Sequence, residues 1–510
     1  MASSKPAAVV LLFVIAVAAL ALRFCQLDRR PMHHDEANQA VRTGVLQETG
    51  AYRYDPHDHH GPTLYYLTLP FAWLTSGRDF AGTTETTFRV VPVLFGAGLI
   101  LLLAWMVDGL GWVGVLVSAA LTALSPAMVY YSRFYIQEML LVFFTFGTVV
   151  GLWRWTRTGT WAWALVTGVF IGLMFTTKET CIIAWVSMVI ALEIAEVWSG
   201  TRRGVLMSMR IRPGQVAAAA GTVAVVAVVF YSSFFTHGSG VVDAVRAYRV
   251  YFERGVDSQN HGHPWYYYWQ VLGWFQEGGK PVWSEGLILA LAAIGAGAIV
   301  LRRKCGGADI VLLRFLLVYT VLMTVFYSAI PHKTPWLALS FLHGMILLAG
   351  AGVIALLEIS TSRVAHWAVG TCVVAAVAQL ATQTYRANFR YESDPRNPYA
   401  YVHTSRDVLK LVKRIENVAA RDEVVAVITN EYDAWPLPWY LRKYRRVGYW
   451  HNVSEIPSQM KPAVIVTSMD KEQAFTGYET EFYGLRPNVL LNLHIREDLW
   501  QKFLSSSSRQ

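Results

Sequence analysis

Long apolar runs alternate with short polar segments along the first three quarters of the chain. A helix that crosses a hydrocarbon core of about 30 Å needs roughly 20 apolar residues. Eleven runs of about this length occur, at residues 7–24, 88–107, 111–130, 135–153, 161–177, 180–198, 214–235, 283–301, 311–330, 337–357 and 364–383. The pattern therefore predicts an all-α polytopic membrane domain over residues 1–383.

Two further runs need separate interpretation. The first run, after Lys5, is predicted to be an uncleaved span, and a signal peptide cleaved near Ala19 and Ala21 is the alternative. The run at 64–74 is too short to span and contains Pro70. We interpret it as a helix that lies in the membrane interface or dips into it.

Composition agrees with a membrane protein. Of the 510 residues, 54% are hydrophobic and only 15% are charged, which is unusual for a soluble domain. A net charge of +9 on a soluble protein would suggest a nucleic-acid partner, but loop charges that set membrane topology explain it here. The four cysteines form no CxxC pair, so neither a structural zinc site nor a disulfide framework is indicated.

The basic loops predict an orientation. Cytoplasmic loops of membrane proteins concentrate Lys and Arg. With eleven spans, three basic loops and Lys5 fall on one side; the loops hold Arg154 and Arg157, then Arg202, Arg203, Arg210 and Arg212, then Arg302, Arg303 and Lys304. The N-terminus is therefore expected in the cytoplasm, with outer loops 23–87 and 236–282 outside.

The last segment, 384–510, has a different pattern. DEVVAVITN and KPAVIVTS are typical of short buried strands, and RDVLKLVKRIENVAA before them is typical of an amphipathic helix. The segment contains no GxGxxG, P-loop or catalytic-triad motif. We predict an extracytoplasmic α/β domain that has no nucleotide-binding role.

Ionisable residues avoid the middles of the spans and gather at their outer ends. This set comprises Asp35, Glu36, Arg133, Glu138, Lys178, Glu179, His332 and Lys333. A carrier with alternating access is expected to place such groups near the midplane instead. The placement favours a one-sided site and chemistry at the outer surface.

The outer-end groups divide into two chemical sets. Asp35, Glu36 and Glu138 can act as a base, a hydrogen-bond acceptor or a metal ligand. The cations Arg133, Lys178 and Lys333 occur singly in short loops and are suited to binding a phosphate at headgroup depth. The alternative is that each cation snorkels to the interface or marks a helix end.

Several short motifs resemble the GT-C glycosyltransferases. They are HHDEA after the first span, HGPTLYYL in the same loop, YYSRFYIQEMLL at the start of the fourth span and TTKET after the fifth. Within that superfamily they are most similar to the protein mannosyltransferase and aminoarabinose transferase branch. PHKTPW, between the ninth and tenth spans, resembles the archaeal and bacterial family associated with flippase activity in protein glycosylation. The resemblance covers roughly the first 360 residues.

The resemblance implies an inverting transferase that uses a polyprenyl-phosphate sugar donor. Asp35 matches the acidic residue that deprotonates the acceptor, and Glu36 completes the acidic pair. Glu138 matches a second acidic position, and Lys178 matches a contact to the donor phosphate. This chain departs from the branch at one motif: it has His60-Gly61-Pro62-Thr63 where the branch commonly has HPPL. The acceptor preference of the branch therefore does not carry over directly to this chain.

Histidines and aromatic residues each allow two interpretations. DPHDHHGP at 55–62, together with His33 and His34, leaves a divalent cation open, but we expect these histidines to shape the loop, with His34 and His60 near substrate. In HGHPWYYYWQVLGWF at 261–275, the rings fit an interfacial belt. Alternatively, Trp265, Tyr266 and their neighbours form a lid over the prenyl chain or the sugar.

The sequence therefore predicts a GT-C membrane glycosyltransferase that needs no nucleotide and no cofactor. Its expected partners are a polyprenyl-phosphate-linked sugar donor, a lipid, glycan or protein acceptor, and membrane lipids, but no nucleic acid. Asp35 is the predicted base, while Arg133, Lys178 and Lys333 neutralise the departing phosphate. The rival prediction is a flippase for lipid-linked sugars, or its accessory subunit. No motif names the sugar or the acceptor.

Overall fold

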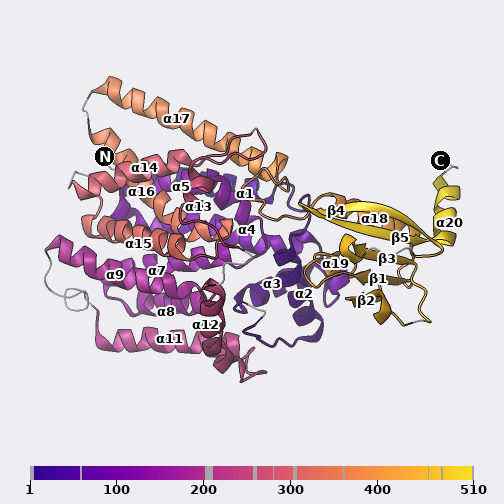
Figure 1. The fold of residues 1–510 in the computed structure, drawn as a ribbon. Helices are drawn as coiled ribbons and strands as arrows, with labels where there is room; N and C mark the ends of the chain where they lie inside the picture. Colours follow the sequence, from indigo (N-terminus) through magenta and orange to yellow (C-terminus); the bar gives the residue numbers. More distant parts are fainter. Residues whose placement is uncertain are drawn as a thin grey trace. The chain divides into compact units, whose positions relative to one another are not determined.

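The computed structural model describes residues 5–57, 60–200, 211–256, 261–279, 281–301, 307–359, 362–457, 459–471 and 475–507. Each of the eleven predicted spans overlaps a helix (Figure 1). These helices are α1 (Lys5–Phe24), α4 (Glu85–Leu102), α5 (Val107–Leu124), α7 (Glu138–Thr158), α8 (Trp161–Phe175), α9 (Cys181–Ser199), α11 (Pro213–Tyr231), α14 (Gly286–Val300), α15 (Ile310–Ala329), α16 (Leu339–Glu358) and α17 (Arg363–Tyr385).

Length and composition qualify most of these helices as membrane spans. Within the described ranges, eight helical stretches are long and apolar enough to cross a membrane, and α8 and α14 are shorter apolar helices. One of the eight, Glu85–Leu124, combines α4 and α5. Gly111, with φ 70° and ψ 161°, breaks the helical path inside α5, at the position where the sequence predicts a new span to begin. A β-branched or bulky residue would strain this backbone.

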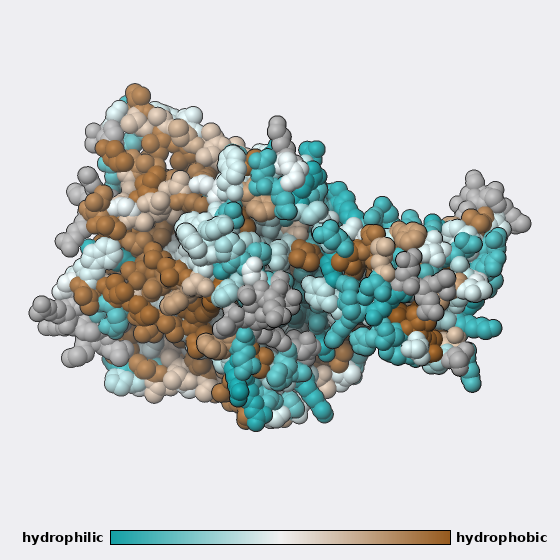
Figure 2. All heavy atoms as spheres, in the orientation of Figure 1, coloured by the Kyte–Doolittle hydropathy of each residue, from teal (hydrophilic) through white to brown (hydrophobic). Residues whose placement is uncertain are grey.

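The helices differ in how much of their surface is covered by protein. In the Pro335–Glu358 stretch, which includes α16, 89% of the apolar window is buried, whereas the corresponding value for Arg363–Arg390 is 6%. The helix α16 therefore lies at the centre of the helical bundle. Figure 2 shows apolar side chains over much of the visible surface of the helical part, as expected where helices face lipid.

A buried arginine ties the ends of three helices together. Arg23, near the end of α1, is fully buried. Its guanidinium donates to the carbonyl of Thr122 at 2.8 Å, to the carbonyl of Ala123 at 3.3 Å and to Ser132 Oγ at 2.8 Å. Ser132 belongs to α6 (Pro126–Ser132). Because the last carbonyls of α5 have no partner within their helix, Arg23 satisfies a helix end that would otherwise be buried without hydrogen bonds.

The chain divides into two compact units that do not follow the predicted boundary at residue 383. The first unit contains residues 1–25, 51–67 and 89–390, and thus most of the apolar helices. The second contains residues 26–50, 68–88 and 391–510. It therefore combines the C-terminal segment with two pieces of the first loop, which carry α2 (His34–Thr49) and the end of α3 (Thr63–Ser76).

The C-terminal segment contains a five-stranded mixed sheet. Its strands are β1 (Val424–Ile428), β2 (Arg446–Trp450), β3 (Val464–Ser468), β4 (Tyr478–Arg486) and β5 (Val489–Arg496), in the order β2-β1-β3-β5-β4. The strand β1 is parallel to β2 and β3, and β5 is antiparallel to β3 and β4. Both strands predicted from sequence, β1 and β3, are buried along their whole length. The predicted helix is α18 (Asp407–Val418).

A tryptophan holds the loop pieces to the C-terminal segment within the second unit. Trp439, in α19 (Leu437–Tyr440), is fully buried, and its indole N–H donates to Glu85 at 3.2 Å. Its ring lies 5.3 Å from the ring of Phe88 and 5.7 Å from that of Phe80. The same unit contains α20 (Glu497–Ser507), whereas α12 (Gly240–Val256) and α13 (Tyr267–Gly273) belong to the helical unit.

Candidate functional site

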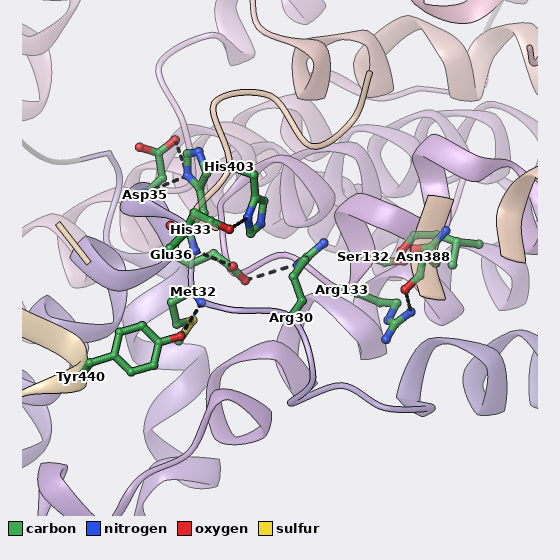
Figure 3. Close-up of polar contacts among 12 residues, drawn as sticks. Arg30, Met32, His33, Asp35, Glu36, Ser132, Arg133, Asn388, His403 and Tyr440 are labelled. Atoms are coloured by element: carbon green, nitrogen blue, oxygen red, sulfur yellow. Dashed lines mark hydrogen bonds and ion pairs between the residues drawn. The ribbon is translucent and has the colours of Figure 1, made fainter. Parts of the chain in front are cut away.

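The acidic pair lies in the first turn of α2, which sequence analysis left inside a loop. His33 is the N-cap residue, and its Nδ1 accepts the backbone N–H of Asp35 at 3.1 Å. The carboxylate of Glu36 accepts the backbone N–H of His33 at 3.1 Å (Figure 3). This reciprocal arrangement is a capping box with histidine in the place usually taken by Ser or Thr. It fixes the direction in which the first turn presents its carboxylates.

The two adjacent carboxylates have different surroundings. Glu36 is fully buried, and its second oxygen lies 3.7 Å from the guanidinium of Arg30. Asp35 keeps 39% of its side chain exposed, and its carboxylate lies 3.8 Å from His33 Nδ1. One member of the pair is therefore engaged in holding the helix start, and the other is accessible to a reactant.

Two buried histidines, His33 and His403, lie beside this turn. The rings of His33 and His403 lie 5.4 Å apart, and both side chains are buried. Burial lowers the pKa of His33, although the charges of Asp35 and Glu36 oppose this effect. Burial also lowers the pKa of His403 well below its usual range. Both imidazoles are therefore neutral at physiological pH, and they place no positive charge beside Arg30.

His34 is packed against aromatic residues of the C-terminal segment. Its ring centroid lies 4.6 Å from that of Tyr432 and 5.7 Å from that of Trp435. Burial lowers the pKa of His34 to about 4. Burial also raises the pKa of Tyr432, and the charge of Asp35 adds to this increase, as expected for a neighbouring anion. The exposed carboxylate and these rings therefore lie close enough for their charges to interact.

In the helical unit, Lys178 and Glu138 form a buried ion pair. The lysine Nζ donates to Glu138 Oε1, and both side chains are at most 7% exposed. Burial acts to lower the pKa of Lys178, but the charge of Glu138 and this hydrogen bond outweigh it, so the pKa lies above its usual value. Sequence analysis selected both residues, and the structure brings them together. Lys178 therefore remains charged within a poorly solvated site.

Glu179 makes a second polar cluster next to that pair. His60 Nδ1 lies 2.9 Å from Glu179 Oε2, and the Tyr54 hydroxyl donates to Glu179 Oε1 at 3.1 Å. The Tyr251 hydroxyl lies 2.9 Å from the same His60 nitrogen, and the two rings are stacked. The sequence pattern places Glu179 among the outer-end charges and gives no signal for Tyr54 or Tyr251. The adjacency of His60 and Glu179 required the folded chain.

The HGPT segment packs directly onto the TTKET segment. Thr63 donates its backbone N–H to the carbonyl of Thr176 at 3.1 Å and its hydroxyl to the same oxygen at 2.8 Å. A Cβ atom at Gly61 would lie 2.1 Å from that carbonyl oxygen. No residue larger than glycine fits there without movement of the backbone. The departure from HPPL at this position therefore has a packing reason in this chain.

The other two predicted cations bind backbone carbonyls. Arg133 donates to the carbonyl of Cys25 at 2.7 Å and to that of Asn388 at 3.1 Å (Figure 3). Lys333 Nζ donates to the carbonyls of Ile330 at 2.5 Å and His263 at 3.0 Å. Burial lowers the pKa of Lys333. These bonds give both cations a structural task in addition to any contact with substrate.

The Lys333 bonds also join the aromatic segment to the PHKTPW segment. Gly262 and His332 form a β-bridge, and the backbone N–H of Lys333 donates to the carbonyl of His261 at 2.9 Å. The predicted lid residues that follow, Trp265 and Tyr266, are 67% and 42% exposed. Both remain open to lipid or to a ligand, and the structure brings their segment beside one of the predicted cations.

The metal alternative concerns the histidine-rich segment at 55–62, of which the structure describes a part. Among the described residues, no three or more His, Cys, Asp or Glu side chains are grouped so that they could hold a metal ion. Asp58 and His59, which belong to the histidine-rich segment, lie outside the described residues. No chemical step below is assigned to a metal.

Comparison with known proteins shows which fold the chain shares. Residues 13–239, a little under half of the chain, match the family model described as dolichyl-phosphate-mannose-protein mannosyltransferase. The structure aligns over 94% of this chain and 97% of the other with ArnT from Cupriavidus metallidurans bound to undecaprenyl phosphate, with a TM-score of 0.65 and 13% identity. The chain therefore has the fold of ArnT, which is a GT-C fold.

Two further structures share the GT-C fold. The archaeal oligosaccharyltransferase AglB from Archaeoglobus fulgidus, in complex with an inhibitory peptide and a dolichol-phosphate, aligns over 91% of this chain and 70% of its own, with a TM-score of 0.59 and 11% identity. An A. fulgidus oligosaccharyltransferase complex with Zn and sulfate aligns over 96% and 75%, with a TM-score of 0.52 and 11% identity. Among curated proteins, no sequence matches the chain significantly. The eight apolar helical stretches of the described ranges make this chain a multi-pass membrane protein, and the shared fold agrees with this.

Proposed function

We propose that this protein is an inverting glycosyltransferase of the GT-C type. It moves a sugar from a polyprenyl-phosphate donor to an acceptor hydroxyl on the extracytoplasmic face, with Asp35 as the base. The observation that carries the proposal is the division of labour at the start of α2. Glu36 is buried in the cap, whereas the Asp35 carboxylate is 39% exposed on the same helical turn.

The chemistry requires a single displacement at the anomeric carbon. The acceptor oxygen forms a bond to that carbon while the bond from the carbon to the phosphate oxygen breaks, which inverts the configuration. The acceptor proton passes to the Asp35 carboxylate, and the bonding electrons leave with the polyprenyl phosphate. The Asp35 carboxylate is suited to accept this proton, because the capped turn fixes its position while 39% of its side chain stays exposed.

Lys178 is the best-supported contact for the departing phosphate. Its charge is maintained by Glu138 in a buried site, where the attraction between Lys178 and a phosphate is screened less than it would be in water. Arg133 and Lys333 stay in the proposal as positive charges, although their described hydrogen bonds hold backbone carbonyls. The ArnT and AglB structures, named as bound to undecaprenyl phosphate and with a dolichol-phosphate, support a polyprenyl-phosphate donor for this chain.

The extracytoplasmic placement rests on the charge of the loops. Arg154, Arg157 and Arg212 lie in loops or at helix ends on the side assigned to the cytoplasm, and Asp35 follows the opposite end of α1. With the basic loops inside, Asp35 and the C-terminal sheet are outside. A donor on that face needs no nucleotide.

The test is turnover by purified protein in detergent. Polyprenyl-phosphate donors that carry different labelled sugars are incubated with membrane glycolipid, glycan and peptide acceptors, and released polyprenyl phosphate is measured with labelled product. We expect release that depends on acceptor and is abolished by Asp35→Asn. A flippase moves its substrate between two compartments without breaking it. The absence of product and of released polyprenyl phosphate with every donor, alongside transport in vesicles, would therefore replace the transferase proposal.

A further inference from the structure

We infer that Tyr432 and Trp435, together with His34, form an acceptor-binding shelf beside Asp35, and that the shelf binds the sugar ring of a carbohydrate acceptor. The inference rests on the proposed transferase function and assigns a role to the C-terminal segment. All the residues involved belong to the second compact unit.

The shelf consists of rings next to the helical turn that carries Asp35. His34 and Asp35 are consecutive residues in the first turn of α2, and the His34 ring lies against those of Tyr432 and Trp435 at 4.6 and 5.7 Å. Tyr432 is 47% exposed. His34 Nδ1 is buried, and no other described group is hydrogen-bonded to it. An aromatic surface therefore begins where the candidate base lies.

Ionic contacts fix the loop that carries these rings. Asp433 pairs with Arg486, the last residue of β4, and the Asn430 side chain donates to Asp433 at 2.5 Å. The Arg486 guanidinium lies 4.3 Å from the centroid of the Tyr432 ring, over its face. Tyr432 is thus held from the sheet side. A platform that is already ordered binds its ligand with less loss of conformational entropy.

The chemistry of this surface favours a carbohydrate over an anionic or peptide ligand. Aromatic faces cover the apolar C–H face of a sugar ring, and a nearby carboxylate accepts a hydrogen bond from one of its hydroxyls. The charge of Arg486 is already balanced by Asp433, so it does not create an anion site. The loop around Tyr432 and Trp435 is turn and short helix, and β1 before it has strands on both sides, so β1 offers no free edge to an extended peptide.

A binding measurement tests the shelf without requiring turnover. The full-length protein in detergent is titrated with mannotriose and, separately, with a Ser/Thr-containing hexapeptide, and binding is followed by saturation-transfer NMR. For mannotriose, Tyr432→Leu and Trp435→Leu are each expected to raise Kd about 5- to 10-fold, which is the range for loss of one aromatic contact. Tyr432→Phe, which keeps the ring, and Phe482→Leu, an exposed aromatic of β4, should leave Kd unchanged.

Transfer kinetics then separate this inference from the proposed function. Relative to the wild-type protein, Tyr432→Leu and Trp435→Leu should raise the acceptor KM while the donor KM stays constant. Mannotriose binding that is absent in the wild type, or that is insensitive to both leucine variants, overturns the shelf even if transfer occurs. A preference of the wild type for the peptide overturns the carbohydrate assignment. Ring-dependent binding without any release of polyprenyl phosphate supports the shelf and refutes the transferase.

Discussion

The contrast between Asp35 and Glu36 gives the sharpest prediction. Asp35→Asn replaces a 39% exposed carboxylate that lies 3.8 Å from the neutral imidazole of His33, so the free energy of unfolding should change by no more than about 0.5 kcal/mol. An amide has the same shape but cannot take the acceptor proton. Loss of general-base catalysis should lower the transfer rate by roughly 10²- to 10⁴-fold, or about 3–5 kcal/mol in activation free energy.

Glu36→Gln should have the opposite profile. Glutamine retains the oxygen that accepts the His33 N–H, but it removes the negative charge beside Arg30, and both side chains are at most 7% exposed. A buried charge that loses its partner destabilises a protein, and at a separation of 3.7 Å we expect about 1–3 kcal/mol. The folded fraction should transfer sugar at a rate within about tenfold of the wild type, since a change that does not touch the reacting atoms has no general-base term to remove.

The assay compares melting temperature in detergent, donor KM and single-turnover transfer rate for the two variants and the wild type. Donor KM should remain constant for Asp35→Asn. A wild-type transfer rate in well-folded Asp35→Asn would refute the reasoning and leave Glu138 as the next candidate base. Equal losses of rate in both variants would mean that the pair acts as one structural element.

Three further predictions concern the ion pair, a histidine and the topology. Lys178→Met should weaken donor use by one to two orders of magnitude and, because it leaves Glu138 unpaired, destabilise the protein by roughly 3–5 kcal/mol. The double variant Lys178→Met/Glu138→Leu should recover the melting temperature but not the donor KM. A folded Lys178→Met variant with wild-type donor KM would mean that Lys178 is only an anchor. The pKa of His34 falls from 6.5 to about 4 on folding, so its contribution of about 3 kcal/mol to the free energy of unfolding is present above pH 6.5 and is lost as the pH falls to about 4. His34→Phe should flatten the dependence of melting temperature on pH over this window, and an unchanged slope would contradict the assignment. In a variant without the native cysteines, a cysteine at Thr160 should be shielded from an impermeant thiol reagent in intact cells and one at Lys410 should react, whereas labelling of Thr160 from outside would reverse the orientation.

Hydrophobicity alone located each span, but it did not reveal α2. A spanning helix is apolar around most of its surface, and this property is visible in one dimension. The buried face of α2 is made largely of Ala37, Ala40, Thr43 and Gly44, which carry little hydrophobic signal. The available local signals were Glu36 three residues after a polar residue and Gly50 at the helix end, where φ is 69°. The capping-box signal was missed because the N-cap residue is histidine and not the usual Ser or Thr.

The sequence by itself determined the membrane class, the apolar helices, the two central strands of the C-terminal sheet and the clustering of ionisable residues at outer helix ends, because each depends on residues close together in the chain. Tertiary structure decided which of these residues meet. It pairs Lys178 with Glu138 and places His60 next to Glu179. It also buries Glu36 while leaving Asp35 accessible, and it packs Tyr432 against His34. The burial of an ionisable group and its ion-pair partners depend on contacts between residues about 40 to 400 positions apart in the sequence. They determine whether the group is charged and whether it is accessible. Neither property is encoded in the local pattern.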